Sequence, residues 1–180
     1  LAGNGGGRHI GDGSGGAFVW HGNKMQHFSA SGIALSDSTG VNFTSYPFPT
    51  SSLGSLDRNG GVWIFWSAPG GSSLDIFGQR IEENGTVQWN PEGLLISEGG
   101  QLQDFPRSVS SEGSAAIIVW DDFRNGHSNV YAARVDTSGV VTDIMDNGSL
   151  LPKSIQLEQN YPNPFNPETT IIYFLPERTN

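Results

Sequence analysis

The 180-residue chain contains no cysteine, which excludes disulfide bridges and thiolate metal sites. This absence leaves the cellular compartment open, because a domain of this size can build a sufficient core without cross-links. The longest apolar runs are about six residues, far below the roughly 20 that a membrane-spanning helix requires. The sequence therefore predicts no transmembrane segment.

Basic residues are also scarce. Nine lysines and arginines oppose 18 aspartates and glutamates, which gives a formal net charge of −9. Binding to a nucleic-acid backbone needs clustered positive charge, and the few basic residues are spread along the chain. We therefore expect no nucleic-acid partner.

Turn residues and aromatic residues are plentiful. The chain has 25 glycines, 10 prolines, 10 phenylalanines, 5 tryptophans and 4 tyrosines. Many turn residues between short apolar runs are typical of an all-β protein. The aromatic side chains supply enough apolar volume for a core, so we predict an all-β fold.

Three short apolar runs end in tryptophan: GGAFVW (15–20), GGVWIFW (60–66) and SAAIIVW (114–120). A run this short and this apolar predicts a strand that is buried on both faces. We interpret these runs as the inner strands of three repeat units. Their closing residues, Trp20, Trp66 and Trp120, are expected to fill the space between units.

A second set of matches gives the period of the repeat. DIFGQRIEENG (75–85) aligns with NVYAARVDTSG (129–139) at an offset of 54, and with NKMQHFSASG (23–32) at an offset of 53. The first copy lacks about seven residues after its tryptophan, which we place in a loop because loops accept length changes. Besides the tryptophans, the predicted structural anchors of the repeat are Arg80, Arg134, Gly32, Gly85 and Gly139, with His27 in the arginine position of the first copy.

Each unit is predicted to be a four-stranded meander. The tryptophan run is followed by DIFGQRI or its equivalent, then by TVQW (86–89) and LLIS (94–97). EENG (82–85) and DTSG (136–139) are predicted hairpin turns in which glycine adopts a positive φ. The polar stretches 44–52 and 101–111, which contain proline, are interpreted as connections to the next unit. Four short strands at this period are typical of propeller blades.

The repeat resembles extracellular bacterial repeats of the form DGxGGxxxxW, then D-[IV]-Y-A-Q-R, then G. The resemblance covers residues 8–150 and implies β-propeller-like domains. Because a closed propeller needs at least four blades, about three copies imply an incomplete array. The expected units are 8–54, 55–107 and 108–150, within a repeat domain that spans residues 1–150. Residues 151–180 are expected to be a proline-rich linker and the truncated start of another domain.

The segment QNYPNPFNPETTI (159–171), followed by LPE (175–177), resembles the opening of the C-terminal sorting domain of type IX secretion substrates. That family has an immunoglobulin-like sandwich, of which this chain would contain the first two strands. The resemblance implies a secretion-machinery partner and an extracellular or outer-membrane location in a Gram-negative bacterium. The chain opens on LAGNGGG, and we expect that its N-terminal part is missing. The residues of the sorting motif are Gln159, Asn160, Tyr161, Pro162, Asn163, Pro164, Phe165, Asn166 and Pro167.

Several patterns with catalytic or binding meaning have structural explanations. GDGSGG (11–16) fits a dinucleotide fingerprint, but a strand and not a helix follows it, so we interpret it as a turn. Asp121 and Asp122 point to opposite faces of a strand, so we expect an ion pair with Arg124 or Arg134 and not a hydrolase pair. The four histidines lack metal-site spacing. We predict no enzyme and no cofactor, with a calcium ion at DDFRNG (121–126) as the alternative.

These observations predict an exported, surface or secreted, non-catalytic repeat protein that binds an unknown protein or glycan. One alternative is a carbohydrate-binding module of a secreted hydrolase, in which an exposed tryptophan such as Trp89 stacks on sugars. The other is a fragment of a propeller enzyme. Because the outer units lack a neighbour, we expect the chain to expose apolar faces and to associate.

Overall fold

The computed structural model describes residues 7–71, 73–143, 156–157 and 173–174. The chain divides into two units, Leu1–Ile144 and Met145–Asn180. All regular structure in the described residues is β-strand, without any helix, which confirms the predicted all-β class. Consequently, the described part of the chain contains no helix that is long and apolar enough to cross a membrane.

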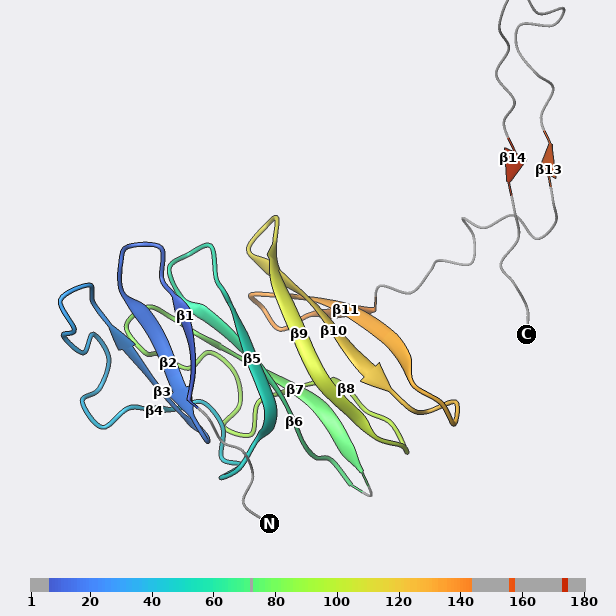
Figure 1. Cartoon of the computed structure of the whole chain (residues 1–180), viewed down its shortest axis with the longest axis horizontal. Helices are drawn as coiled ribbons and strands as arrows, with labels where there is room; N and C mark the ends of the chain where they lie inside the picture. The colour runs from blue at the N-terminus through green and yellow to red at the C-terminus, as the bar shows by residue number, and fades with distance from the viewer. Residues whose placement is uncertain (1–6, 72, 144–155, 158–172, 175–180) are drawn as a thin grey trace, which may run out of the picture. The chain divides into compact units, whose positions relative to one another are not determined.

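The first unit consists of three four-stranded antiparallel sheets, none of them closed into a barrel (Figure 1). In each sheet the strands are neighbours in chain order, so each sheet is a four-stranded meander, although its four strands are not all those predicted. Sheet 1 contains β1 (Arg8–Gly11), β2 (Ala17–His21), β3 (Lys24–Phe28) and β4 (Val41–Asn42). Sheet 2 contains β5 (Thr50–Leu56), β6 (Val62–Pro69), β7 (Leu74–Ile81) and β8 (Leu94–Ser97). Sheet 3 contains β9 (Gln103–Ser111), β10 (Ala115–Asp122), β11 (Asn129–Asp136) and β12 (Val141–Asp143).

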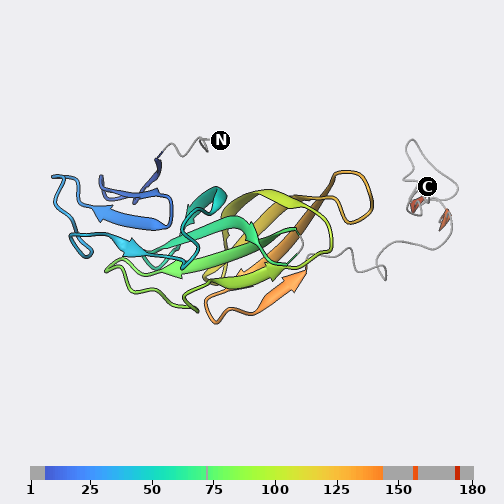
Figure 2. The same cartoon turned by 90° about the horizontal axis from the view of Figure 1, so that it is seen from below.

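The three sheets are layered in chain order, with sheet 2 in the middle (Figures 1 and 2). Two hydrophobic cores hold the layers together, one on each side of sheet 2. The core between sheets 1 and 2 contains Phe18, Trp20, Met25, Phe43, Val62, Ile64, Trp66, Ala68, Phe77 and Ile81. The core between sheets 2 and 3 contains Trp63, Phe65, Ile76, Ile96, Ala116, Ile118, Trp120, Ala133 and Val135. We call the face of a sheet that is turned toward the next sheet its front face, and the opposite one its rear face.

The predicted burial of the tryptophan strand on both faces is confirmed for β6 alone. Its side chains alternate between the two cores, with Ile64 and Trp66 on the rear face and Trp63 and Phe65 on the front face. All seven residues from Val62 to Ala68 are buried. In β2 and β10, by contrast, buried and half-buried residues alternate along most of the strand. Among the described residues, sheets 1 and 3 each have a neighbour on one side only, so their outward-facing residues are less buried.

Two strand predictions are wrong. The stretches 44–52 and 101–111, expected to be connections, contain the start of β5 and the whole of β9, the first strands of sheets 2 and 3. The tryptophan strand is therefore the second strand of its sheet and has a partner on both sides, so it cannot be an inner edge strand. TVQW (86–89) forms only an isolated bridge between Val87 and Ile81. It lies along β7 ahead of β8 and does not form a separate strand. The expected boundaries at 54/55 and 107/108 fall inside β5 and β9.

The predicted alignment of Trp20 with Trp66 is wrong by one residue. Gln26 and Gln79 occupy the same repeat position. Gln26 pairs with Val19, one residue before Trp20, whereas Gln79 pairs with Ile64, two residues before Trp66. Trp20 therefore corresponds to Phe65. Its side chain lies on the front face of its sheet, opposite to the rear face that carries Trp66. Both tryptophans enter the same core, but from opposite sides.

The third copy keeps the predicted alignment. Ala133 pairs with Ile118, two residues before Trp120. This matches sheet 2, where the partner of Gln79 is also two residues before the tryptophan. Trp120 accordingly lies on the rear face of sheet 3, in the second core. The three tryptophans do fill the space between sheets, as expected.

The deletion in the first copy removes mainly strand residues. His21 pairs with Lys24 across a two-residue turn, whereas the β6–β7 hairpin extends to the pair of Pro69 with Leu74. With Trp20 aligned to Phe65, equivalent residues of sheets 1 and 2 are 45 positions apart in β2 and β6, but 53 apart in β3 and β7. The first copy therefore lacks eight residues between these strands. Six of these belong to the ends of the two strands, and only the rest belong to the loop.

In the second unit, two short strands are described. β13 (Gln156–Leu157) pairs antiparallel with β14 (Tyr173–Phe174). The predicted sorting motif, residues 159–167, lies outside the described residues.

Candidate functional site

A tight turn connects β1 to β2 and is organised by Asp12. The carboxylate oxygen Oδ1 accepts hydrogen bonds from the backbone N–H groups of Ser14 (2.7 Å) and Gly16 (2.9 Å). The backbone N–H of Asp12 donates to the carbonyl oxygen of Gly16. This confirms that GDGSGG is a turn before a strand, because a dinucleotide site would need a helix N-terminus there.

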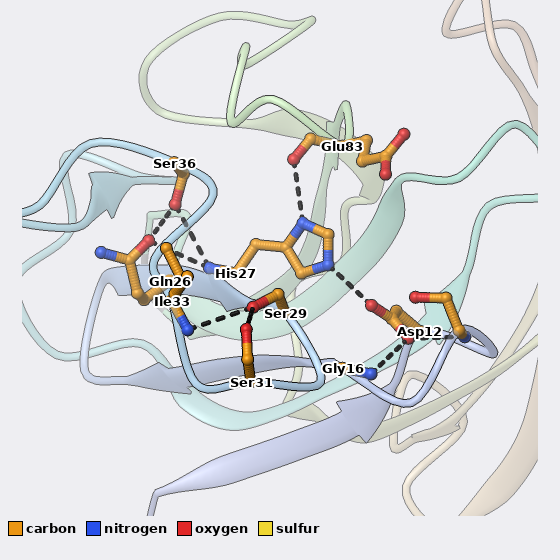
Figure 3. A network of polar contacts seen from close by, with 10 residues as sticks. Asp12, Gly16, Gln26, His27, Ser29, Ser31, Ile33, Ser36 and Glu83 are labelled. Carbon is orange, nitrogen blue, oxygen red and sulfur yellow. Dashed lines mark hydrogen bonds and ion pairs between the residues drawn. The ribbon is translucent and has the colours of Figure 1, made fainter.

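The other oxygen of Asp12 binds a buried histidine. His27 lies on the front face of β3 and is 1% exposed. Its Nε2 is 3.0 Å from Asp12 Oδ2, and its Nδ1 is 3.0 Å from the backbone oxygen of Glu83 in sheet 2 (Figure 3). The ring also stacks on Phe18, with 4.0 Å between ring centroids. One side chain therefore links the turn of sheet 1 to a turn of sheet 2.

Both ring nitrogens of His27 face atoms that only accept hydrogen bonds. An imidazolium, which carries a proton on each nitrogen, satisfies both the Asp12 carboxylate and the Glu83 carbonyl. The hydrogen bond from His27, assisted by the one from Ser14, lowers the pKa of Asp12 to about 2. Since neither nitrogen faces an open space, the pair resembles a catalytic dyad in composition only. Its geometry is that of a link between two sheets.

Sheet 2 has an ion pair at the equivalent position. Asp57 accepts hydrogen bonds at Oδ2 from Nε (2.7 Å) and Nη2 (2.6 Å) of Arg80. The Asp57 side chain is fully buried, and the guanidinium lies 5.8 Å from the ring centroid of Trp63. A buried carboxylate in this setting is stable because it is paired and hydrogen-bonded. Arg80, predicted as an anchor, thus secures the β5–β6 turn against β7.

The third copy keeps the cation but not the acid. By strand pairing, Arg134 is equivalent to Arg80, whereas Ser111 stands at the position of Asp57. Arg134 therefore lies on the front face of sheet 3 without the carboxylate that its equivalent has. Among the described residues, no hydrogen bond of its guanidinium is present.

A surface cavity of about 440 Å³ lies beside the Asp57–Arg80 pair. Its walls combine a guanidinium that is already neutralised by Asp57 with two carboxylates and two amides. Such a surface can offer hydrogen bonds to a polar ligand and carries a net negative charge. The lining residues are Leu35, Asn59, Arg80, Glu82, Glu83 and Asn84.

The DDFRNG loop also contains an ion pair. Asp122 is fully buried and accepts hydrogen bonds from Arg124 on both oxygens, at 2.9 and 2.6 Å. Burial opposes its charge, but the hydrogen bonds from Arg124 and Trp120 outweigh this effect, and the pKa of Asp122 is lowered. The Arg124 guanidinium also lies over the ring of Tyr131, 4.4 Å from its centroid. The expected pairing with Arg124 is confirmed for Asp122, whose carboxylate is already occupied by this cation.

A further group of polar residues lies at this end of sheets 2 and 3. Burial raises the pKa of Asp75, which accepts a hydrogen bond from the N–H of Gly99. Gln103 is also fully buried, and its amide has no hydrogen-bond partner among the described residues. Within the described part of the chain, no three histidine or acidic side chains gather as a metal site would require.

The predicted glycine anchors lie at turns with positive φ: +77° at Gly32, +90° at Gly85 and +83° at Gly139. Two of them also face the preceding sheet closely. A Cβ at Gly85 would lie 2.8 Å from the Cβ of Ser36, and one at Gly139 would lie 3.2 Å from Nε1 of Trp89. At Gly32, no described atom lies within 4 Å of that position.

The tryptophans belong to the scaffold. Four of the five are at most 3% exposed, and Trp89 is half-buried against Trp63, with 5.6 Å between ring centroids. A sugar-stacking platform needs an open ring face, which the four buried tryptophans do not offer.

Sequence reasoning missed the roles of Asp12 and Asp57. A signal for both was present, because each aspartate lies four residues before the second glycine of a Gly-Gly pair, at Gly16 and Gly61. No family model, curated protein or solved structure matches this chain.

Proposed function

We propose that this chain is part of an exported, non-catalytic repeat protein that acts by binding, at a cell surface or in the medium. The three stacked sheets are interpreted as an incomplete β-propeller-like array. Residues 155–177 are interpreted as the start of an immunoglobulin-like sorting domain of the type IX kind. The partners would be the secretion machinery and a protein or glycan ligand.

The observation that carries the non-catalytic part is the use of the polar residues for packing. In the two buried pairs, Asp12–His27 and Asp57–Arg80, the polar groups are engaged with one another. Asp122 is engaged in the same way with Arg124. Groups committed to structure in this manner favour a scaffold that presents a surface. The export part rests on the sequence QNYPNPFNPETTI.

Export is tested with the full-length protein, epitope-tagged ahead of the repeats, in a bacterium that has a type IX secretion system. We expect the tag at the cell surface or in the medium, and its retention inside the cell in a strain without the machinery. A matched variant replaces the asparagines of the sorting motif by alanine and leaves the repeats unchanged. Equal export with and without the machinery would contradict the proposal.

The non-catalytic part is tested with the purified protein. We expect binding to a protein or glycan array without any turnover, and loss of binding when residues that line the surface cavity are substituted. Consumption of an array ligand by the wild-type protein, abolished by His27→Gln, would contradict it.

A further inference from the structure

Each outward face of the stack matches, at several positions, a face that is already buried inside it. Sheet 1 differs at the positions of Trp66 and Phe77, where its rear face has His21 and Lys24. The rear face of sheet 1 and the front face of sheet 3 have no neighbour among the described residues. The pairing of the second and third strands in each sheet shows which residues of the three sheets occupy equivalent positions. We propose that these two faces bind each other between molecules, so that a second copy of this chain docks its sheet 1 onto sheet 3 of the first.

Gln26 is a polar residue on the rear face of sheet 1, and its hydrogen bonds are satisfied within the sheet. Gln26 donates to the carbonyl oxygen of Asp37 and accepts the backbone N–H of His27. In sheet 2, Gln79 forms the same two bonds, with Asn90 and Arg80, and is fully buried. The amide of Gln26 is thus satisfied within its own sheet and can lose contact with water at little cost.

Gly32 indicates that no described residue packs closely on this face at its turn. Its equivalents, Gly85 and Gly139, each lie under side chains of the preceding sheet, whereas Gly32 faces open space. A glycine in this turn permits close approach of a neighbouring sheet as well as a positive φ. Among the described residues, nothing approaches Gly32 closely, so in sheet 1 only the positive φ requires a glycine. In the proposed complex, the second copy would lie close to Gly32.

The front face of sheet 3 offers the matching surface. Ile117 and Val119 are equivalent to Trp63 and Phe65, which are fully buried between sheets 2 and 3. Val130 on the same face is 75% exposed. By the same equivalence it matches Ile76, which is fully buried.

Arg134 supplies a polar contact in the same register. Within the chain, His27 on the front face of sheet 1 reaches the backbone oxygen of Glu83 in the next sheet. Arg134 is the equivalent of His27 in sheet 3, and Ala30 is the equivalent of Glu83 in sheet 1. Docking in the register of the interface between sheets 1 and 2 therefore places the guanidinium at the Ala30 carbonyl of the second copy.

This contact is heterologous, because it joins two different faces. Such an interface repeats into open chains or closed rings and does not stop at a symmetric dimer. The inference depends on the equivalence of the sheets and not on the export proposed above, so the two can fail separately.

Sedimentation velocity of the 180-residue chain over a range of concentrations is the test. We expect species larger than a dimer as the concentration rises. Val130→Lys blocks the front face of sheet 3, and Val19→Lys blocks the rear face of sheet 1. Each variant alone should be a monomer, because burying an unpaired charge lowers the association constant by about 100-fold or more. An equimolar mixture should form dimers that grow no further, because one unblocked face of each kind remains.

Phe48→Lys is the control, since this side chain is 84% exposed and lies in the connection between β4 and β5, outside both faces. It should associate like the wild type. A wild-type monomer at all concentrations would overturn the proposal, as would dimers formed by either blocked variant alone. Circular dichroism and the urea midpoint of each blocked variant show that the substitution leaves the fold intact.

Discussion

Replacing Gly85 with alanine should destabilise the chain more than the same replacement at Gly32. Both glycines have a positive φ, so an alanine costs about 1–2 kcal/mol of backbone energy at either position. At Gly85 the new Cβ would also lie 2.8 Å from Ser36 and 2.9 Å from Val41, and one of these must move. Overpacking of this kind typically adds ~1–3 kcal/mol. Gly32→Ala makes no such contact and is the matched control.

Urea unfolding followed by tryptophan fluorescence measures both effects, because the tryptophans are buried in the two cores. We expect the free energy of unfolding to fall by about 1–2 kcal/mol for Gly32→Ala and by about 2–5 kcal/mol for Gly85→Ala. Dilute protein keeps the comparison free of association between copies. Equal losses at the two positions would refute the inference that Gly85 is needed for contact between sheets.

Three further predictions concern single side chains. Ser114 has a φ of +51° and occupies a position at which the other two copies have glycine. Ser114→Gly should therefore raise the free energy of unfolding by about 1 kcal/mol and the midpoint of thermal unfolding by about 2–4 °C. An unchanged midpoint would contradict this. Asp12 has a folded pKa of about 2, below its ordinary value of 3.8, so its stabilising effect is present above pH 4 and disappears as the pH falls toward 2. Asp12→Asn should therefore flatten the stability profile in that window, and a profile as steep as that of the wild type would exclude the pairing with His27. Asp57→Ala leaves the Arg80 cation buried and unpaired and should cost about 3–5 kcal/mol, whereas the double change with Arg80→Met should cost less; urea unfolding decides between these outcomes.

The apolar strands could be predicted from the sequence because their burial leaves a direct pattern. β6 and β10 are short apolar runs bounded by turn residues, and the glycines at their turns follow from the same spacing. β9 could not be recognised in this way. It lies at the edge of its sheet, so one side needs no backbone partner, and Phe105 and Pro106 fall in its bulge. Its serines and its proline therefore resemble a loop in the sequence.

The alignment error at Trp20 has a different origin. The sequence comparison matched residues of one type, whereas the fold preserves the pairing between β2 and β3. A shift by one residue in a strand moves each side chain to the other face. Sheet 2 has buried tryptophans on both faces, Trp63 and Trp66, so the residue type alone could not reveal the shift.

The candidate site was harder to predict because its partners come from different elements. Asp12 and His27 are 15 residues apart and meet only through the pairing of β2 with β3. The contact of His27 with Glu83 spans 56 residues and depends on the stacking of two sheets. No local spacing in the sequence indicates such a contact. The repeated Asp-to-glycine spacing could, however, have indicated the turns at Asp12 and Asp57.

The hairpins between the second and third strands differ in length from sheet to sheet. The connection is two residues in sheet 1, between His21 and Lys24, and it is longer after Pro69 and Asp122. The length of this tip thus varies among the three copies. The tip is accordingly a suitable position for grafting foreign peptides, so this scaffold could display three different inserts on one chain.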